Sequence, residues 1–186
     1  MYGMVNKAVE EMVVMHHGEP TWERIKAKAG VDVDVFMSNQ GYPDEITYKL
    51  VGAASEILQL PAETILQAFG EHWVLHTAQE GYGALLRAGG RTLREFLVNL
   101  HDFHTRVKMI FPDLKPPGFE CTDVTSHSLN LHYLTHRPGM TQFVVGLVHG
   151  LGKMFRTPVN VRVVADRANG AEHDVFHIEW GEPPAS

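Results

Sequence analysis

Apolar residues recur every three or four positions through the N-terminal part of the chain, which is the spacing of amphipathic helices. Prolines at segment starts and glycines after segment ends mark the helix boundaries. Four glycines, at positions 81, 83, 89 and 90, are expected to break regular structure before the last of these helices. The pattern predicts helices over residues 2–17, 20–29, 43–57, 61–76 and 93–107.

The pattern changes after residue 112. Pro116, Pro117 and Gly118 predict a stiff, extended connector. A long helix is expected from just after Gly139 to about Phe155. Alternating apolar and polar residues predict strands over 119–123, 128–136, 159–165 and 175–180, with a hairpin signal at Asn169-Gly170. The sequence thus predicts an α+β fold, with a helical N-terminal half, a mainly antiparallel C-terminal sheet and a boundary near residues 112–118.

The helix predicted after Thr92 contains an unusual buried position. Thr92 and Glu95 form a capping box, so the helix is expected to begin at residue 93. On a continuous helix, His104 points within about 40° of Leu97 and Leu100, in the buried stripe. A buried histidine costs desolvation unless its ring nitrogens find partners. Two interpretations stay open: a core histidine bonded to a backbone carbonyl, or an axial ligand of a haem iron.

Composition and charge narrow the function classes. The 186 residues are 44% hydrophobic and 20% charged, which suits one globular domain, and the net charge of −6 argues against nucleic acid or anionic lipid as the main partner. No apolar run reaches transmembrane length, and Glu10 and Glu11 argue against an export signal. The single cysteine, Cys121, excludes an intrachain disulfide and covalent haem attachment, and favours a cytoplasmic location. Twelve histidines hint at metal chemistry.

A row of polar side chains follows the second predicted strand. Tyr133, Thr135 and Arg137 alternate along it, so they are expected to face one way, about 7 Å apart at each step. Two hydroxyls and a guanidinium can hold two carboxylates of one rigid molecule. The alternative is a half-exposed strand end with a solvated arginine.

Several short segments together give the chain a family resemblance. They are MYGMVNKA, FGEHW, LHDFHTRV, PPGFEC, HYLTHR and GLVHGLGK, and they extend over nearly the whole length. The sequence resembles the haem nitric oxide/oxygen-binding (H-NOX) family, which is related to the haem domain of soluble guanylate cyclase. The resemblance implies one stand-alone bacterial haem domain over residues 1–186, with about 1–62 as a distal helical part and about 63–186 as the haem-bearing part.

The resemblance also implies how haem b is held without a covalent bond. His104 corresponds to the proximal iron ligand. Tyr133, Thr135 and Arg137 correspond to the family's Tyr-x-Ser-x-Arg motif for the haem propionates, with threonine replacing serine and keeping the hydroxyl. Pro117, or its neighbour Pro116, is expected to press on the porphyrin face.

The distal residues bear on which gas binds. By resemblance, Phe143 stands where dioxygen-binding members have a hydrogen-bonding tyrosine, and the loss of that donor costs bound dioxygen about 1–3 kcal/mol. Nitric oxide and carbon monoxide need the bond less. The indole N–H of Trp73 is a further donor, although a core tryptophan more often only packs. The other expected distal residues are apolar: Val5, Val74 and Leu147. We therefore expect a nitric oxide sensor that also binds carbon monoxide and discriminates against dioxygen.

Signalling is expected to follow from the same residues. Nitric oxide weakens the iron bond to His104, the histidine-bearing helix is freed, the haem releases Pro117, and the two parts of the domain shift. The chain is expected to catalyse no reaction, so the signal passes to a separate effector. The resemblance implies a histidine kinase or a cyclic-di-GMP enzyme as this partner.

Other histidine groupings support competing functions. His72 and His76 are four residues apart on a predicted helix, a spacing that can chelate zinc. The metalloprotease and di-iron signatures are absent from the sequence. A zinc or di-iron enzyme is the alternative from a different class, and a redox or haem-level sensor is the third possibility.

Overall fold

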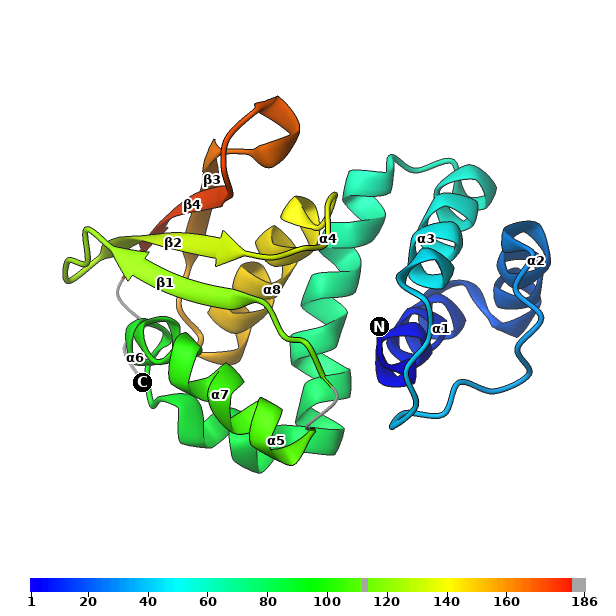
Figure 1. Cartoon of the computed structure of the whole chain (residues 1–186), viewed down its shortest axis with the longest axis horizontal. Coiled ribbons are helices and arrows are strands. Elements are labelled where there is room, and N and C mark those ends of the chain that lie inside the picture. The colour runs from blue at the N-terminus through cyan, green and yellow to red at the C-terminus, as the bar shows by residue number, and fades with distance from the viewer. Residues whose placement is uncertain (112–113, 182–186) are drawn as a thin grey trace.

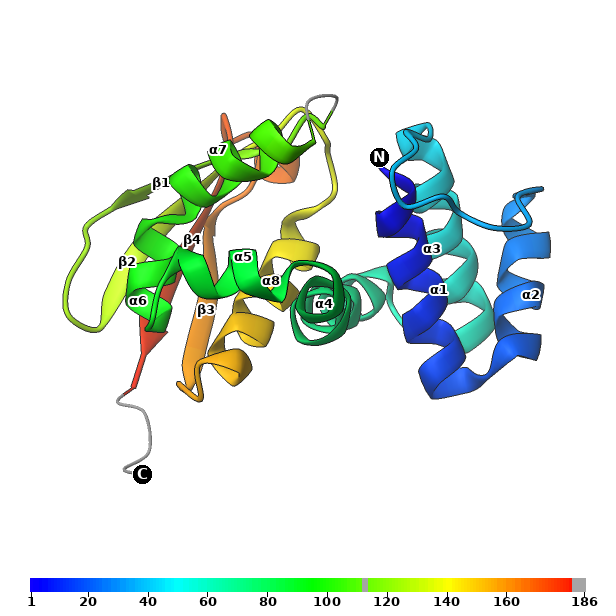
Figure 2. The same cartoon turned by 90° about the horizontal axis from the view of Figure 1, so that it is seen from below.

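The computed structural model describes residues 1–111 and 114–181. Helices α1 (Gly3–His17), α2 (Glu19–Ala29) and α3 (Asp44–Leu58) form a group at one end of the molecule. Helix α4 (Ala62–His72) lies between this group and the rest, as the two perpendicular views show (Figure 1 and Figure 2). It continues through a π-helical turn, η1 (Trp73–Thr77), into α5 (Ala78–Gly89). None of the helices in the described ranges is long and apolar enough to cross a membrane.

The C-terminal part is built on one antiparallel sheet. Its strands are β1 (Gly118–Thr122), β2 (Ser128–Leu134), β3 (Val159–Ala165) and β4 (Asp174–Trp180), in the order β1-β2-β4-β3. A 3-10 turn, η2 (Arg167–Asn169), and Gly170 with φ of 93° connect β3 to β4, as the hairpin signal predicted. Helix α8 (Thr141–Met154) connects β2 to β3. The predicted α+β class is confirmed.

Glycines allow α4 and α8 to cross at backbone contact. A Cβ atom on Gly146 would lie 2.1 Å from the carbonyl oxygen of Gln67, and one on Gly70 would lie 2.2 Å from that of Phe143. No other residue type fits these positions without moving a helix backbone. The contact fixes η1, at the end of α4, beside the apolar side of α8.

The helix that bears His104 is shorter than predicted. Half of the capping box is confirmed: the Thr92 hydroxyl accepts from Glu95 N at 3.1 Å, whereas the Glu95 carboxylate accepts from Arg91 N at 2.8 Å. However, α6 (Leu93–Val98) and α7 (Leu100–Ile110) are separate helices, and the prediction of one continuous helix was wrong. The Asn99 side chain donates to the carbonyl of Gly89 at 3.1 Å, which stabilises a non-helical turn at this residue.

Two other boundaries also differ from the sequence prediction. Residues 78–89 are helical, so glycines 81 and 83 do not interrupt the helix, and the only irregularity within it is a kink at Tyr82. Packing of the buried Ala78 and Leu86 outweighs the helix cost of about 1 kcal/mol per glycine. Strand β2 ends at Leu134, two residues earlier than expected. Of the predicted connector, residues 112 and 113 lie outside the described ranges.

Candidate functional site

An apolar cavity of about 250 Å³ lies between the helices and the sheet. Its wall comes from α1, η1, α5, α6, α7, the connector, β1, β2 and α8, and most of its side chains are leucine, valine, phenylalanine or methionine. A large apolar pocket with a few polar groups is the usual form of a cofactor site. Most of the expected site residues line this one cavity: Val5, Trp73, Val74, His104, Pro117, Tyr133, Arg137, Phe143 and Leu147.

His104 presents a free ring nitrogen to the cavity. Its Nδ1 donates to the carbonyl of Leu100 at 2.9 Å, and this leaves Nε2 as the nitrogen with a lone pair. The ring packs between Phe103 and Phe119, with centroids 5.4 and 5.0 Å away. Burial lowers the pKa of His104, although the bond to Leu100 opposes the shift. A neutral imidazole oriented by a backbone carbonyl is the usual state of a histidine metal ligand.

Tyr133, Thr135 and Arg137 do not form the straight row that the sequence suggested. Only Tyr133 lies on β2, because the strand ends at Leu134. The Thr135 hydroxyl accepts from Arg137 N at 3.1 Å, which turns the chain after the strand, and Thr135 is not among the side chains that line the cavity. Burial raises the pKa of Tyr133, so its hydroxyl is a neutral donor. Tyr133 and Arg137 reach the cavity, and Thr135 holds the turn between them.

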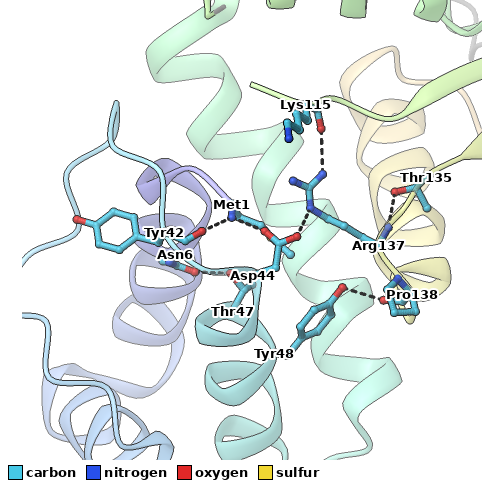
Figure 3. Close-up of polar contacts among 10 residues, drawn as sticks. All are labelled: Met1, Asn6, Tyr42, Asp44, Thr47, Tyr48, Lys115, Thr135, Arg137 and Pro138. Atoms are coloured by element: carbon cyan, nitrogen blue, oxygen red, sulfur yellow. Dashed lines mark hydrogen bonds and ion pairs between the residues drawn. The ribbon is translucent and has the colours of Figure 1, made fainter. Parts of the chain in front are cut away.

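Arg137 is part of an ion-pair network at the edge of the cavity (Figure 3). Its Nε donates to Asp44 Oδ2 at 2.8 Å, and its Nη1 donates to the carbonyl of Lys115 at 3.0 Å. The N-terminal ammonium of Met1 contacts the other oxygen of Asp44. Burial alone raises the pKa of Asp44, but the ammonium and Arg137 outweigh it and the net pKa is lowered. Two cations therefore meet where a carboxylate of a cofactor would be held.

Asp44 was missed by the sequence analysis. It lies 93 residues from Arg137, on a different part of the fold, and no local spacing connects the two. Tyr82 was missed as well, because the glycines around it suggested irregular chain. Its hydroxyl donates to Met4 Sδ at 3.8 Å, and both side chains line the cavity.

Apolar side chains make up the wall contributed by α1, η1 and α8. Phe143 packs against Phe69 with ring centroids 4.7 Å apart, and Trp73 meets the same ring edge-on at 6.4 Å. Phe143 has no hydrogen-bond donor to offer a ligand. Val5, Val74 and Leu147 complete this part of the wall.

The residues present fit a haem group. Haem combines a flat apolar ring, an iron that accepts an imidazole nitrogen, and two carboxylates. The cavity offers an apolar wall, the free nitrogen of His104, and the Arg137 guanidinium beside the N-terminal ammonium. Each chemical feature of the cofactor therefore has a counterpart in the cavity.

Comparisons with known proteins agree with this geometry. The family HNOB, described as Haem-NO-binding, matches residues 2–163. Soluble guanylate cyclase gcy-31 of Caenorhabditis elegans is 27% identical over 176 residues, which are 94% of this chain and 24% of that protein. Soluble guanylate cyclase 89Db of Drosophila melanogaster is 24% identical over 155 residues, which are 83% of this chain and 23% of that protein. The chain thus spans about a quarter of the length of these relatives.

Solved structures show the same fold. An H-NOX protein from S. oneidensis in the Fe(II)NO ligation state superposes with a TM-score of 0.89 at 19% identity, covering 98% of this chain and 100% of that one. An oxygen-binding H-NOX domain related to soluble guanylate cyclases gives a TM-score of 0.80 at 18% identity, covering 100% and 98%. Because the family match covers most of the chain, the protein belongs to the haem-NO-binding, or H-NOX, family of haem-binding gas-sensor domains.

Proposed function

We propose that this chain is a nitric oxide sensor that also binds carbon monoxide and does not hold dioxygen as a stable ligand. The observation that carries the proposal is Phe143, which lines the cavity from α8 and packs on Phe69 without any donor group. Bound dioxygen carries partial negative charge, and the absence of a buried donor costs it about 1–3 kcal/mol. Bound nitric oxide and carbon monoxide carry less charge, so the missing donor costs them less binding free energy.

The chain's own residues have distinct parts in holding haem b. His104 Nε2 takes the iron, because Nδ1 is engaged with Leu100. Arg137 and Tyr133 take the propionates, and Thr135 holds the turn that places Arg137. Pro117 lines the cavity from the connector, where it would contact the porphyrin. When bound, the haem would supply a ferrous iron that can bind a diatomic gas.

In the proposed signal, His104 would first give up the bond that it would make to the iron. The imidazole then keeps only its bond to Leu100, and α7 is free to move with respect to the cavity. The movement passes to the boundary between about residues 1–62 and about residues 63–186. Hydrogen bonds cross this boundary from Arg137 to Asp44 and from the Tyr48 hydroxyl to the carbonyl of Pro138, 2.9 Å away. These contacts are the ones that a shift of the two parts would change.

The proposed receiver of the signal is a separate effector protein, either a histidine kinase or a cyclic-di-GMP enzyme, in the cytoplasm. We propose that the chain itself catalyses no reaction and uses neither nucleic acid nor a membrane as partner. The alternative of a zinc or di-iron enzyme lacks support, because no three histidine, cysteine, aspartate or glutamate side chains converge as a metal-ligand set within residues 1–111 and 114–181.

Visible spectra of the purified, reduced protein test the proposal. We expect a Soret band, complexes with nitric oxide and carbon monoxide, and no stable dioxygen complex in air. The nitric oxide spectrum should be that of five-coordinate iron, because His104 is released. Colourless protein after growth with ample haem precursor would overturn haem binding. A stable dioxygen complex would overturn the gas selectivity, and a six-coordinate nitric oxide spectrum would overturn the release of His104.

A further inference from the structure

A second cavity, of about 560 Å³, lies between α1 and the turn that joins α4 to α5. It shares no lining residue with the apolar cavity. Its wall includes apolar residues such as Val14 and Phe36, but its chemistry is that of ionisable side chains: Lys7, Glu10, Glu11, His72, His76 and Glu80. Nothing in the proposed gas-sensing function uses these groups.

His72 is the unexplained residue of this second cavity. Its side chain is only 5% exposed, yet neither ring nitrogen has a hydrogen-bond partner among the described residues. A buried polar group without a partner costs about 1–3 kcal/mol. Burial, together with the neighbouring His76 and His16, lowers the pKa of His72 to about 4, so the ring is neutral at neutral pH. A neutral imidazole offers one lone pair to a ligand.

A second imidazole lies beside His72. The rings of His72 and His76 are nearly parallel, with centroids 4.6 Å apart and an interplanar angle of 23°. Both residues line the same cavity and lie four positions apart on a continuous helical segment, a spacing from which two imidazoles can chelate one ion. Imidazole pairs of this kind select zinc, copper or nickel over magnesium or calcium.

The surrounding charge also favours a cation. Among the lining residues, four glutamates outnumber the single lysine, Lys7, which leaves an excess of negative charge: Glu10, Glu11, Glu19 and Glu80. Burial raises the pKa of Glu10, and the adjacent Glu19 raises it further, although Lys26 and Lys7 oppose the shift. A divalent cation in the cavity would relieve this repulsion.

We propose that His72 and His76 chelate one divalent cation of the zinc class in this acidic cavity. Because no three ligating side chains converge within the described residues, water supplies the remaining coordination positions. The ion gives His72 the partner that the protein does not provide. This site is separate from the haem cavity and binds the metal without haem.

The position of the site links it to the gas-binding cavity. Trp73 and Val74 lie between the two histidines in the sequence, on the π-helical turn η1, and both line the haem cavity. An ion bound to His72 and His76 fixes both ends of that turn. The metal therefore stiffens part of the wall that a gas ligand contacts, which couples the two sites. This second step depends on the proposed gas-sensing function, but metal binding does not.

Zinc titration of the haem-loaded, carbon monoxide-bound protein tests the site, with a chromophoric zinc chelator as competitor. We expect His76→Asn to lower the affinity for one bound zinc ion by about tenfold or more. Loss of a residue that only supports a metal ligand already lowers metal affinity by about that factor. His76 is only half-buried, so the variant should fold. The matched control is His132→Asn, which disrupts the other close histidine pair, where His132 Nδ1 and His173 Nε2 are 2.8 Å apart.

The outcomes separate the claims. Unchanged zinc affinity in His76→Asn, or absence of zinc binding by the wild type, would overturn the site. Displacement of the zinc by millimolar magnesium would also overturn it, because that behaviour belongs to carboxylates alone. The coupling predicts that zinc changes the carbon monoxide dissociation rate in the wild type and not in His76→Asn. Equal rates with and without bound zinc would overturn the coupling and leave the metal site standing.

Discussion

The two nitrogens of His104 show how one side chain can satisfy two interpretations of a sequence. The carbonyl of Leu100 occupies Nδ1, as expected of a core histidine, and the same bond leaves Nε2 free on a ring that lines the cavity, as required of a ligand. The hydrogen bond alone therefore does not distinguish the two. The apolar cavity beside the ring distinguishes the two interpretations, because a purely structural histidine does not require a cavity.

At the residue scale, we propose that the side chain of Phe143 determines gas selectivity. Phe143→Tyr places a hydroxyl on the cavity wall, and a buried donor is worth about 1–3 kcal/mol to bound dioxygen, or about 5- to 150-fold in affinity. We expect the variant to hold dioxygen longer in air, followed by visible absorption, with little change for carbon monoxide. Phe143→Leu is the control, since it changes the packing against Phe69 without adding a donor. Equal behaviour of the two variants would show that another group, such as Trp73 or Tyr82, decides the selectivity.

Individual site residues could be predicted where the surrounding sequence is unusual or matches a family motif. His104 stood out as a histidine in an apolar stripe, and Tyr133 and Arg137 formed part of a family motif; all three line the cavity. No sequence pattern or motif pointed to Asp44. Its role comes from a contact with Arg137 that only the folded chain creates, so spacing along the sequence carried no information about it.

Elements were predictable where a periodic pattern met a clear boundary residue. The first three helices and strands β1, β3 and β4 follow their patterns closely. The break between α6 and α7 was not predictable, because Asn99 reaches a carbonyl of Gly89 in another element. The early end of β2 has a similar origin, since the ladder with β4 stops at the pair Tyr133–Asp174. Both errors come from tertiary contacts that override local preference.

The crossing of α4 and α8 gives a prediction at the scale of elements. Gly146→Ala introduces a methyl group 2.1 Å from the Gln67 carbonyl oxygen, so the two backbones must separate. Overpacking of this kind typically costs about 1–3 kcal/mol, which thermal unfolding of the carbon monoxide-bound protein followed by circular dichroism would detect. The control is Gly52→Ala on α3, which meets nothing within 4 Å and should stabilise its helix by about 0.5–1 kcal/mol. Loss of stability in both variants alike would mean that the close crossing is not the cause.

At the scale of the whole molecule, the two parts are joined through a few polar contacts around Asp44. The N-terminal ammonium and Arg137 approach the same carboxylate from different parts of the fold. Beside it, Thr47 donates to Asn6 at 2.5 Å and ties α3 to α1. A movement of α1–α3 relative to the sheet must therefore break or stretch the pair between Asp44 and Arg137.

Asp44→Asn measures what this contact contributes. The folded-state pKa of Asp44 lies below its ordinary value of 3.8, so the charged form stabilises the fold above that pH, and the contribution is lost as pH falls through the lowered pKa. The pair is partly solvent-exposed, so we expect the variant to be less stable by about 1 kcal/mol or less near neutral pH. The difference should persist down to about pH 4 and shrink below it, as measured by urea unfolding at a series of pH values. Glu45→Gln, at the exposed neighbouring position, should change stability little at any pH. A stability difference between wild type and Asp44→Asn that does not vary with pH would assign the effect to packing of α3 and not to the charge that joins the two parts.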